Sequence, residues 1–454
     1  MSARLPRLAL GVLVVGLVLH NLVLAELWDA GVRGRALDVV AAWKEVLLLV
    51  VLGLVAWHAR RLPITLAADR LALVYTAFVL LYAVLPQEWL GGAATTKGVL
   101  YALRHDLVPV AAYALGRLAV LSRNDRRSLG WLAVGAGAVL SVWGLVDVYA
   151  VPLQWWRESG VPGWFRHQLS LDYGPGLSHL PENWVYNTGD EEHPLRRLVS
   201  TFLSPLASAY LLVFALIFLA SRERLGRWSV VAALCCFAGL LWTHTRAATL
   251  ALVLGLVLLA AAQRRLRPAE AAVAVIVISL GFFAVYTSVG PRTSYTKSEL
   301  AYLRENAQRH PLAGGDPFSS GDTSLTSHWR NLRAGVRAVV RHPQGYGLGN
   351  AGTEAKRTNV EIRAGESTYT QLGVETGLAG MLAFIAWALA ILWGLWSRSP
   401  WLFAAFGAML AVALQTDVLG VPWLAYVLFA LAGSALSEDA SGARRRDVVE
   451  PRRE

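Results

Sequence analysis

Long apolar stretches separated by polar loops recur along most of the chain. Most reach about 18 residues and lack the strict alternation of a strand, so the pattern favours membrane-spanning helices over a β-barrel. We expect about twelve spans, at residues 6–26, 37–58, 66–86, 98–120, 129–150, 198–220, 229–244, 247–263, 269–290, 369–396, 401–416 and 422–437. The fold class predicted is an all-α polytopic membrane protein.

Two long polar segments divide these apolar stretches into groups. The pattern predicts transmembrane helices one to five in residues 1–150, a first outer loop at 151–197, helices six to nine in 198–290, a large outer loop at 291–368, helices ten to twelve in 369–437 and a disordered cytoplasmic tail at 438–454. The large loop contains "SHWRNLRAGVRAVVRHP", which predicts an amphipathic helix with an apolar face formed by Leu332, Val336, Val339 and Val340.

Composition and charge agree with a membrane protein. The chain is 55% hydrophobic and only 16% charged, whereas soluble domains are about a quarter charged. Arginines concentrate in the short loops and in the tail, and they all lie on one side if both termini are cytoplasmic. The net charge of +11 therefore sets topology and does not indicate nucleic-acid binding. The two cysteines, Cys235 and Cys236, are adjacent and suggest neither a disulfide framework nor a zinc site.

Charged residues inside predicted spans are functional candidates, because burying charge in a membrane is costly. Lys44 and Glu45 lie near the outer end of the second span, where they either pair or extend to the interface. Arg104 lies about two turns into the fourth span, where its side chain can reach an outward-facing cavity, and Asp106 is a candidate to neutralise it.

Further cations lie at the predicted outer face. His244 and Arg246 occupy a turn with almost no loop, and Arg196 and Arg197 begin "RRLVSTFLSP". Arg330 and Arg333 belong to the large loop. Arginine is suited to holding a phosphate through two hydrogen bonds, so these arginines together with Arg104 predict a site for an anionic lipid-linked diphosphate. The alternative is a basic surface facing anionic lipids. No metal-ligand motif or phosphate-binding glycine loop is present, so we expect neither a metal nor another cofactor.

Four motifs in the second half resemble the O-antigen ligase and O-antigen polymerase superfamily. They are "RLVSTFLSP", "THTRAATLAL", "SHWRNLRAGVRAVVRHPQGYGLGNAG" and "ESTYTQLGVETGLAG", in the family's order and on a similar topology. The resemblance implies a GT-C-like membrane glycosyltransferase of the bacterial inner membrane, with its active site on the outer face. It also implies inverting transfer from a polyprenyl-diphosphate-linked oligosaccharide, with Arg246 as a diphosphate ligand.

The resemblance also provides candidate site residues. Where the ligases have a histidine proposed as base, this chain has Glu366, and His328 fits a variant associated more with polymerases. A carboxylate near the interface can have a raised pKa and act as base, although Arg363 would oppose that rise. The alternative is that Glu366 complements the following helix dipole, with Ser367 or Thr368 as cap. His244 and Tyr369, within these motifs, are expected to contact substrate.

The main functional hypothesis is therefore a polysaccharide polymerase whose acceptor is another lipid-linked repeat unit. The first alternative is an O-antigen ligase whose acceptor is a lipid A-core sugar. The second is a transporter for a lipid-linked oligosaccharide, which should carry charge along a path through several spans. The unusual charges here lie at the outer end instead, which favours the enzymes.

Overall fold

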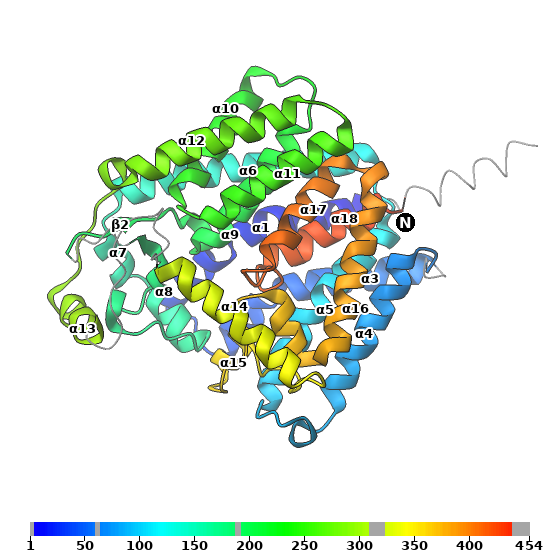
Figure 1. Ribbon diagram of the computed structural model, residues 1–454, viewed down its shortest axis with the longest axis horizontal. Helices are drawn as coiled ribbons and strands as arrows, with labels where there is room; N and C mark the ends of the chain where they lie inside the picture. Colours follow the sequence, from blue (N-terminus) through cyan, green and yellow to red (C-terminus); the bar gives the residue numbers. More distant parts are fainter. Residues whose placement is uncertain (1–3, 60–63, 187–191, 308–322, 438–454) are drawn as a thin grey trace, which may run out of the picture.

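A computed structural model describes residues 4–59, 64–186, 192–307 and 323–437 (Figure 1). Within these residues the chain is mainly helical, and the only strands are β1 (Val185–Tyr186) and β2 (Leu195–Arg196), which pair antiparallel. The predicted disordered tail, 438–454, lies outside the described residues. The predicted fold class, an all-α membrane protein, is confirmed.

Each predicted span corresponds to a helix or a helix pair. In chain order these are α1 (Arg4–Asp29), α2 (Arg35–Ala41) with α3 (Trp43–Ala59), α4 (Ala67–Val84), α5 (Thr96–Ala119), α6 (Arg123–Ala150), α9 (Pro205–Ala220), α10 (Arg227–Trp242), α11 (Arg246–Gln263), α12 (Arg267–Val289), α16 (Thr368–Arg398), α17 (Pro400–Val412), and η6 (Leu424–Leu428) with α18 (Phe429–Ala435).

Helix length identifies fewer membrane crossings than the sequence pattern predicts. Among the described residues, six helices are long and apolar enough to cross a membrane, or seven if α2 and α3, bent by 47°, count as one. Four further apolar helices are shorter, and α5 is long but carries Arg104, His105 and Asp106. The chain is a multi-pass membrane protein, and twelve spans stay a prediction.

The two long segments fold mostly into short helical elements on one side of the helical body. The first contains α7 (Leu153–Glu158), α8 (Gly160–Gly163), η2 (Trp164–Gln168), η3 (Pro175–Leu177) and η4 (Glu182–Trp184), and the second contains α13 (Lys297–Ala307), α14 (Thr323–Arg341) and α15 (Gly352–Arg357). In Figure 1, α7, α8 and α13 lie to the left, whereas α1 begins at the right. Arg157 and Glu299 join the two segments through an ion pair of 2.7 Å.

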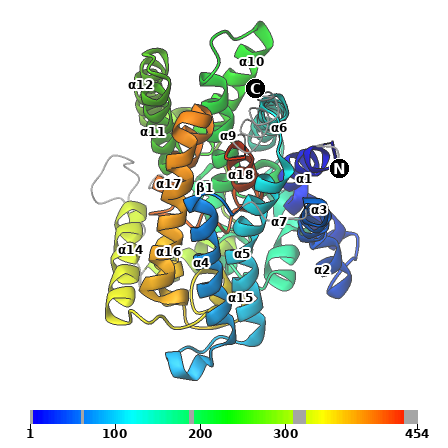
Figure 2. The same ribbon diagram turned by 90° about the vertical axis from the view of Figure 1, so that its right-hand side faces the viewer.

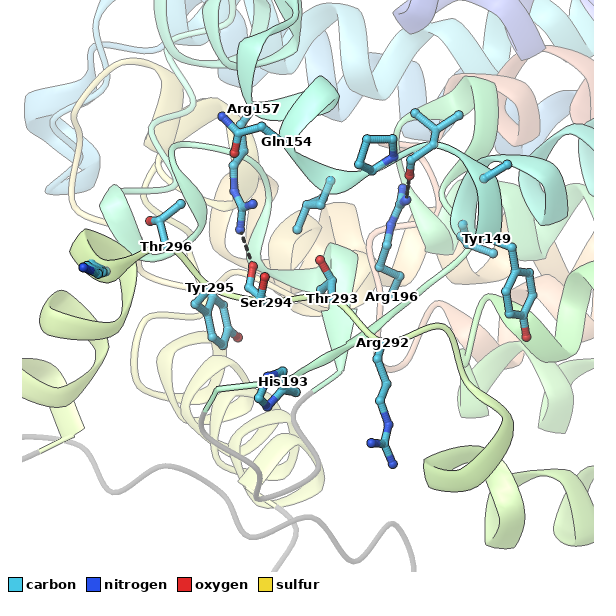
Figure 3. Close-up of a pocket in the computed structure, with 16 residues that line it drawn as sticks. Tyr149, Gln154, Arg157, His193, Arg196, Arg292, Thr293, Ser294, Tyr295 and Thr296 are labelled. Atoms are coloured by element: carbon cyan, nitrogen blue, oxygen red, sulfur yellow. Dashed lines mark hydrogen bonds between the residues drawn. The ribbon is translucent and has the colours of Figure 1, made fainter.

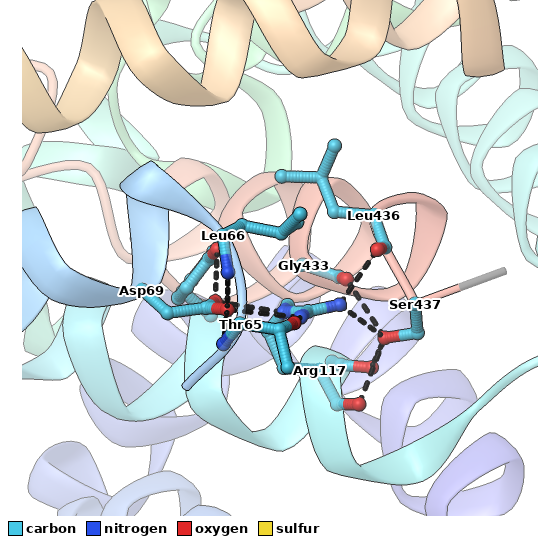
Figure 4. A network of polar contacts seen from close by, with 9 residues as sticks. Thr65, Leu66, Asp69, Arg117, Gly433, Leu436 and Ser437 are labelled. Carbon is cyan, nitrogen blue, oxygen red and sulfur yellow. Dashed lines mark hydrogen bonds and ion pairs between the residues drawn. The ribbon is translucent and has the colours of Figure 1, made fainter. Parts of the chain in front are cut away.

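A buried ion pair fixes the opposite ends of several helices (Figure 4). Arg117 of α5 donates to Asp69 of α4 through Nε at 2.8 Å and through Nη2 at 2.9 Å. Its Nη1 donates to the carbonyl of Leu436 at 2.6 Å and to Ser437 Oγ at 3.2 Å. The pair is satisfied by hydrogen bonds, as a buried charge requires, and it ties α4 and α5 to the end of α18.

Close packing of α5 against α18 depends on two glycines. A Cβ on Gly116 would lie 2.0 Å from the carbonyl oxygen of Ala430, and one on Gly433 would lie 2.2 Å from that of Tyr113. Small residues allow helix backbones to approach inside membranes, where packing rather than hydrophobicity drives association. This contact holds the last helix of the bundle in place.

The amphipathic helix predicted in the large loop is α14, and it lies alongside α16 (Figure 2). Its packing face differs from the one predicted. Gly335 and Val339 are buried against Thr370 and Gly373 of α16, whereas Val340 is 71% exposed. The small residues at 335 and 373 permit the close approach, so the contact face includes Val339 as predicted but is centred on Gly335 rather than on Val336 and Val340.

The glycine-rich segment after α14 holds the following elements against α16. Gly345 has a φ of +74°, and a Cβ there would lie 2.4 Å from the Gly377 nitrogen at the break in α16. The Gly349 amide donates a 2.9 Å hydrogen bond to Glu375. The glycines therefore serve a tight backbone contact, which orients α15 and the residues up to Glu366.

Candidate active site

Glu366 lies just before α16, but its carboxylate faces α14. Asn331 Nδ2 donates a 2.8 Å hydrogen bond to Glu366 Oε1, and His328 Nδ1 contacts Glu366 Oε2. His328 and Asn331 are three residues apart on α14, so they share one face of the helix. The two predicted base candidates are thus in direct contact. We call Glu366, His328 and Asn331 the Glu366 cluster.

The Glu366 cluster lies beside a cavity of about 440 Å³. The cavity is formed by α14, by α15 and by the segment that leads into α16, and its lining includes Asn331, Gly335, Lys356, Arg363 and Glu366. A cavity of this size falls within the range of small-ligand sites. A group bound there can reach a carboxylate and two cations.

Two opposing effects set the pKa of Glu366. Partial burial raises the pKa, whereas the hydrogen bond and charge of His328, together with the hydrogen bond from Asn331, lower it, and the net shift is downward. The expected rise in pKa is therefore wrong, and His328 rather than Arg363 is the main opposing group. Glu366 is ionised at neutral pH and can accept a proton.

The residues after Glu366 contact the end of α17 and do not cap their own helix. Ser367 occupies the N-cap position of α16 but makes no side-chain cap, and its hydroxyl donates to the carbonyl of Ala413 at 3.0 Å. The Thr368 hydroxyl donates to the carbonyl of Thr416 at 3.2 Å. The side-chain cap expected from Ser367 or Thr368 is therefore absent within the described residues.

The tight turn predicted between two spans is confirmed, and it brings Arg246 near Arg197. Arg197 Nε donates to the Thr243 carbonyl at 2.8 Å, and its Nη2 donates to Thr245 Oγ1 at 3.0 Å. Burial lowers the pKa of Arg197 to about 10, where nearby Tyr286 opposes the shift and the charge of Arg246 adds to it. Arg197 remains charged at neutral pH. We call Arg197 and Arg246 the arginine pair.

The neighbouring Arg196 has a different environment. It is buried and donates to both carboxylate oxygens of Asp147 at 3.2 Å, as well as to the carbonyl of Val151. It lines a second cavity of about 810 Å³, together with Arg157 and Arg292 (Figure 3). The two consecutive arginines therefore have different partners. Arg196 holds α6 to β2, and Arg197 contacts the α10–α11 turn.

Electrostatic interactions and hydrogen bonds link the arginine pair with residues next to the Glu366 cluster. Tyr210 of α9 lies next to Thr416 and within electrostatic range of Arg197 and Asp417. Asp417 accepts a 3.4 Å hydrogen bond from Thr368, two residues after Glu366. Both groups of candidate residues therefore border the same part of the bundle, although they come from separate regions of the sequence.

Two predicted substrate residues have contacts within the protein. His244 is 5% exposed. The centre of its ring lies 4.2 Å from the ring centre of Tyr186 and 4.4 Å from that of Tyr286. The Tyr369 hydroxyl donates to the carbonyl of Leu410 at 2.8 Å. Their roles in substrate binding stay predictions.

Arg330, Arg333 and Arg104 are exposed, whereas Lys44 is buried. Arg330 and Arg333 lie on the outer face of α14, and the Arg333 guanidinium lies 4.9 Å from the Trp329 ring centre. Arg104 pairs with Glu45 at 3.5 Å, and Lys44 also lies 3.5 Å from Glu45, so the pairing expected there is confirmed. Their binding of diphosphate stays a prediction.

The partner expected for Arg104 is engaged elsewhere, in a buried polar network that the sequence did not predict. His105 lies between two carboxylates, with Nδ1 2.8 Å from Asp106 Oδ1 and Nε2 3.0 Å from Asp417 Oδ2. Gln371 donates a 3.0 Å hydrogen bond to Glu354. The network connects α5, α15 and α16 with the segment after α17. It therefore holds in place the helices that adjoin the candidate site.

Asn331, Lys356 and Arg363 were also missed as site residues. The only available signal was spacing, because Asn331 follows His328 by three helical positions. Among the described residues, no group of three or more His, Cys, Asp or Glu side chains is arranged to hold a metal ion.

Comparison with known proteins agrees with the motifs. Residues 230–385 match the family model described as O-antigen ligase, whereas no curated protein matches the chain. The matched segment runs from α10 into α16 and contains Arg246, His328 and Glu366. The match supports a membrane glycosyltransferase of the ligase or polymerase type in general. Over residues 230–385, about a third of its length, the chain is therefore similar to the O-antigen ligase family.

Proposed function

We propose that the chain is a polysaccharide polymerase, which moves a glycan from polyprenyl diphosphate to the terminal sugar of another lipid-linked repeat unit. The reaction takes place at the outer face of a bacterial inner membrane, with both termini cytoplasmic. The observation that supports this proposal is the Glu366 cluster, in which a carboxylate held by His328 borders a cavity. The ligases, as the resemblance implies, have a histidine base at the position of Glu366.

The proposed chemistry assigns Glu366 the role of general base. The acceptor hydroxyl oxygen forms a bond to the anomeric carbon of the donor as the bond from that carbon to the diphosphate breaks. The electron pair of the broken bond leaves with the diphosphate, and the hydroxyl proton goes to Glu366. Attack opposite the leaving group inverts the anomeric centre. Asn331 and His328 keep the carboxylate oriented and ionised.

The leaving diphosphate requires positive charge, and the arginine pair supplies it in this proposal. Arg197 is held in place by Thr243 and Thr245, and Arg246 starts α11. The N-terminus of a helix adds favourable potential for an anion. Preorganised donors aimed at developing charge are a major source of catalysis.

The second candidate is an O-antigen ligase, which the description of the matched family favours. The two reactions share the donor and differ in the acceptor. Purified protein should therefore be incubated with a polyprenyl-diphosphate repeat unit alone, and then with a lipid A-core acceptor added. A ladder of products from the repeat unit alone supports the polymerase. Product that forms only with the second acceptor supports the ligase, and no product with either contradicts both.

A further inference from the structure

The cavity beside Glu366 is basic. Its lining includes Lys356 and Arg363, and residues 328–366 contain seven Lys or Arg against three Glu. We propose that this cavity is the acceptor subsite and that it selects an acidic sugar, whose carboxylate binds Arg363 and Lys356. This inference rests on the proposed function, because it names the acceptor class for the same site.

Aromatic rings hold both cations in place. The Arg363 guanidinium lies 4.2 Å from the centre of the Tyr346 ring, and Lys356 Nζ lies 4.7 Å from that of Tyr173. Stacking engages the face of a guanidinium and leaves the N–H groups at its edge available. A planar carboxylate can therefore form two parallel hydrogen bonds with Arg363 without moving it from the ring.

The carboxylates near these cations leave room for a ligand. Arg363 Nη2 lies 3.6 Å from Glu361 Oε2, which is longer than a hydrogen bond, and the Glu361 side chain is 78% exposed, so this pair is weak. Glu182 lies within electrostatic range of Lys356, so its carboxylate already balances part of the positive charge of Lys356. Arg363 is thus the principal anion-binding group of the cavity, with Lys356 as a weaker second.

Glu366 gives the bound acid a preferred orientation. Its carboxylate repels the carboxylate of the sugar, whereas Arg363 and Lys356 attract it. The sugar therefore places a hydroxyl, and not its acid group, next to Glu366. The same charges that select the acceptor then present its nucleophilic oxygen to the base.

The test compares two probes that differ only at C6, methyl β-D-glucuronide and methyl β-D-glucoside, binding to the full-length protein in detergent. Saturation-transfer NMR titrations should show about tenfold or tighter binding of the glucuronide at low salt, since a hydrogen bond to a charged group contributes that much.

Arg363→Gln should remove most of this preference, and Lys356→Gln a smaller part. Arg337→Gln, an exposed change on α14 outside the cavity lining, should retain it. Equal binding of the two probes, or the same loss in Arg337→Gln, would overturn the inference.

Binding and transfer are measured separately, so the two proposals can fail separately. Glu366→Gln should bind the glucuronide at least as tightly as wild type, because it removes a like charge. If no transfer is found in any assay while the preference for glucuronide persists, the proposed function fails and the anion site stands. If transfer proceeds equally well to neutral and acidic acceptors, the inference fails and the proposed function stands.

Discussion

His328 of α14 contacts the carboxylate of Glu366 across 38 positions of sequence. The contact joins the large loop to the residue that leads back into the helical bundle. Burial raises the pKa of Glu366, and the hydrogen bond and charge of His328, together with the hydrogen bond from Asn331, lower it further than burial raises it. The activity of the site should therefore depend on both residues, and in different ways.

Glu366→Gln should lower the rate of glycan transfer by about 10²–10⁴-fold, the usual contribution of a general base. Binding of the polyprenyl-diphosphate donor should change little, since the arginine pair is intact. Single-turnover rates and donor affinity measured on the same preparation would separate these effects. Glu361→Gln removes an exposed carboxylate nearby and serves as control. A wild-type rate in Glu366→Gln would leave it without a role as base.

His328→Gln should move the acidic limb of the pH–rate profile toward higher pH. His328 lowers the pKa of Glu366, so without it burial raises that pKa, and the base is protonated at a higher pH than in wild type. Activity then falls earlier as the pH decreases. The profile of kcat/KM tests this directly. An unchanged acidic limb with a uniformly lower rate would mean that His328 acts on substrate and not through Glu366.

Arg246→Ala should abolish transfer while the protein remains folded in the membrane. The diphosphate then lacks one of two guanidinium groups, and Arg246→Lys should recover only part of the rate, because lysine cannot form the two parallel hydrogen bonds. Product formation and detergent-extracted yield are the measurements. Arg224→Ala, an exposed change in the short loop between α9 and α10, is the matched control. Normal product from Arg246→Ala would remove the arginine pair from the mechanism.

Transfer should persist in the presence of a chelator. The mechanism proposed here uses arginine side chains to balance the charge of the leaving diphosphate, so a divalent ion is not required. Rates measured with EDTA and with added Mg²⁺ or Mn²⁺ provide the comparison. A strict requirement for metal contradicts the arginine mechanism, even if Arg246 proves essential.

Arg117→Met should destabilise the bundle strongly, by about 3–5 kcal/mol, because it leaves the buried carboxylate of Asp69 without its counter-charge. The double change Asp69→Asn with Arg117→Met should cost less than Arg117→Met alone. Melting temperatures in detergent measure both. Arg70→Met removes an exposed arginine next to Asp69 and should have little effect. Equal melting temperatures for Arg117→Met and wild type would show that the pair does not stabilise the fold.

The sequence predicted the helices well and their breaks poorly. Apolar length located every span-like helix, because burial in lipid leaves a strong local signal. The 47° bend between α2 and α3 and the break of α16 at Gly377 have a different origin. Gly377 meets the backbone of the Pro343–Gln344 segment, so its conformation depends on a contact that no local pattern reveals.

The candidate site was predicted as separate residues and not as a cluster. Arg246, His328 and Glu366 each belong to a recognisable motif, yet the contact between His328 and Glu366 depends on how α14 packs on α16. Glycines at positions 335 and 373 set that packing, and glycine carries no hydrophobic signal. The pairing of Asp69 with Arg117 has no sequence signal, because both residues lie near the ends of two spans where charge is common.

The partners of Arg117 impose an order on assembly. Arg117 is synthesised 319 residues before Leu436 and 320 before Ser437, which supply its last two hydrogen bonds. Until α18 arrives, the bonds to Leu436 and Ser437 cannot form, whereas the ion pair with Asp69 can. The early helices therefore remain incompletely bonded during biosynthesis, and insertion of α18 completes them.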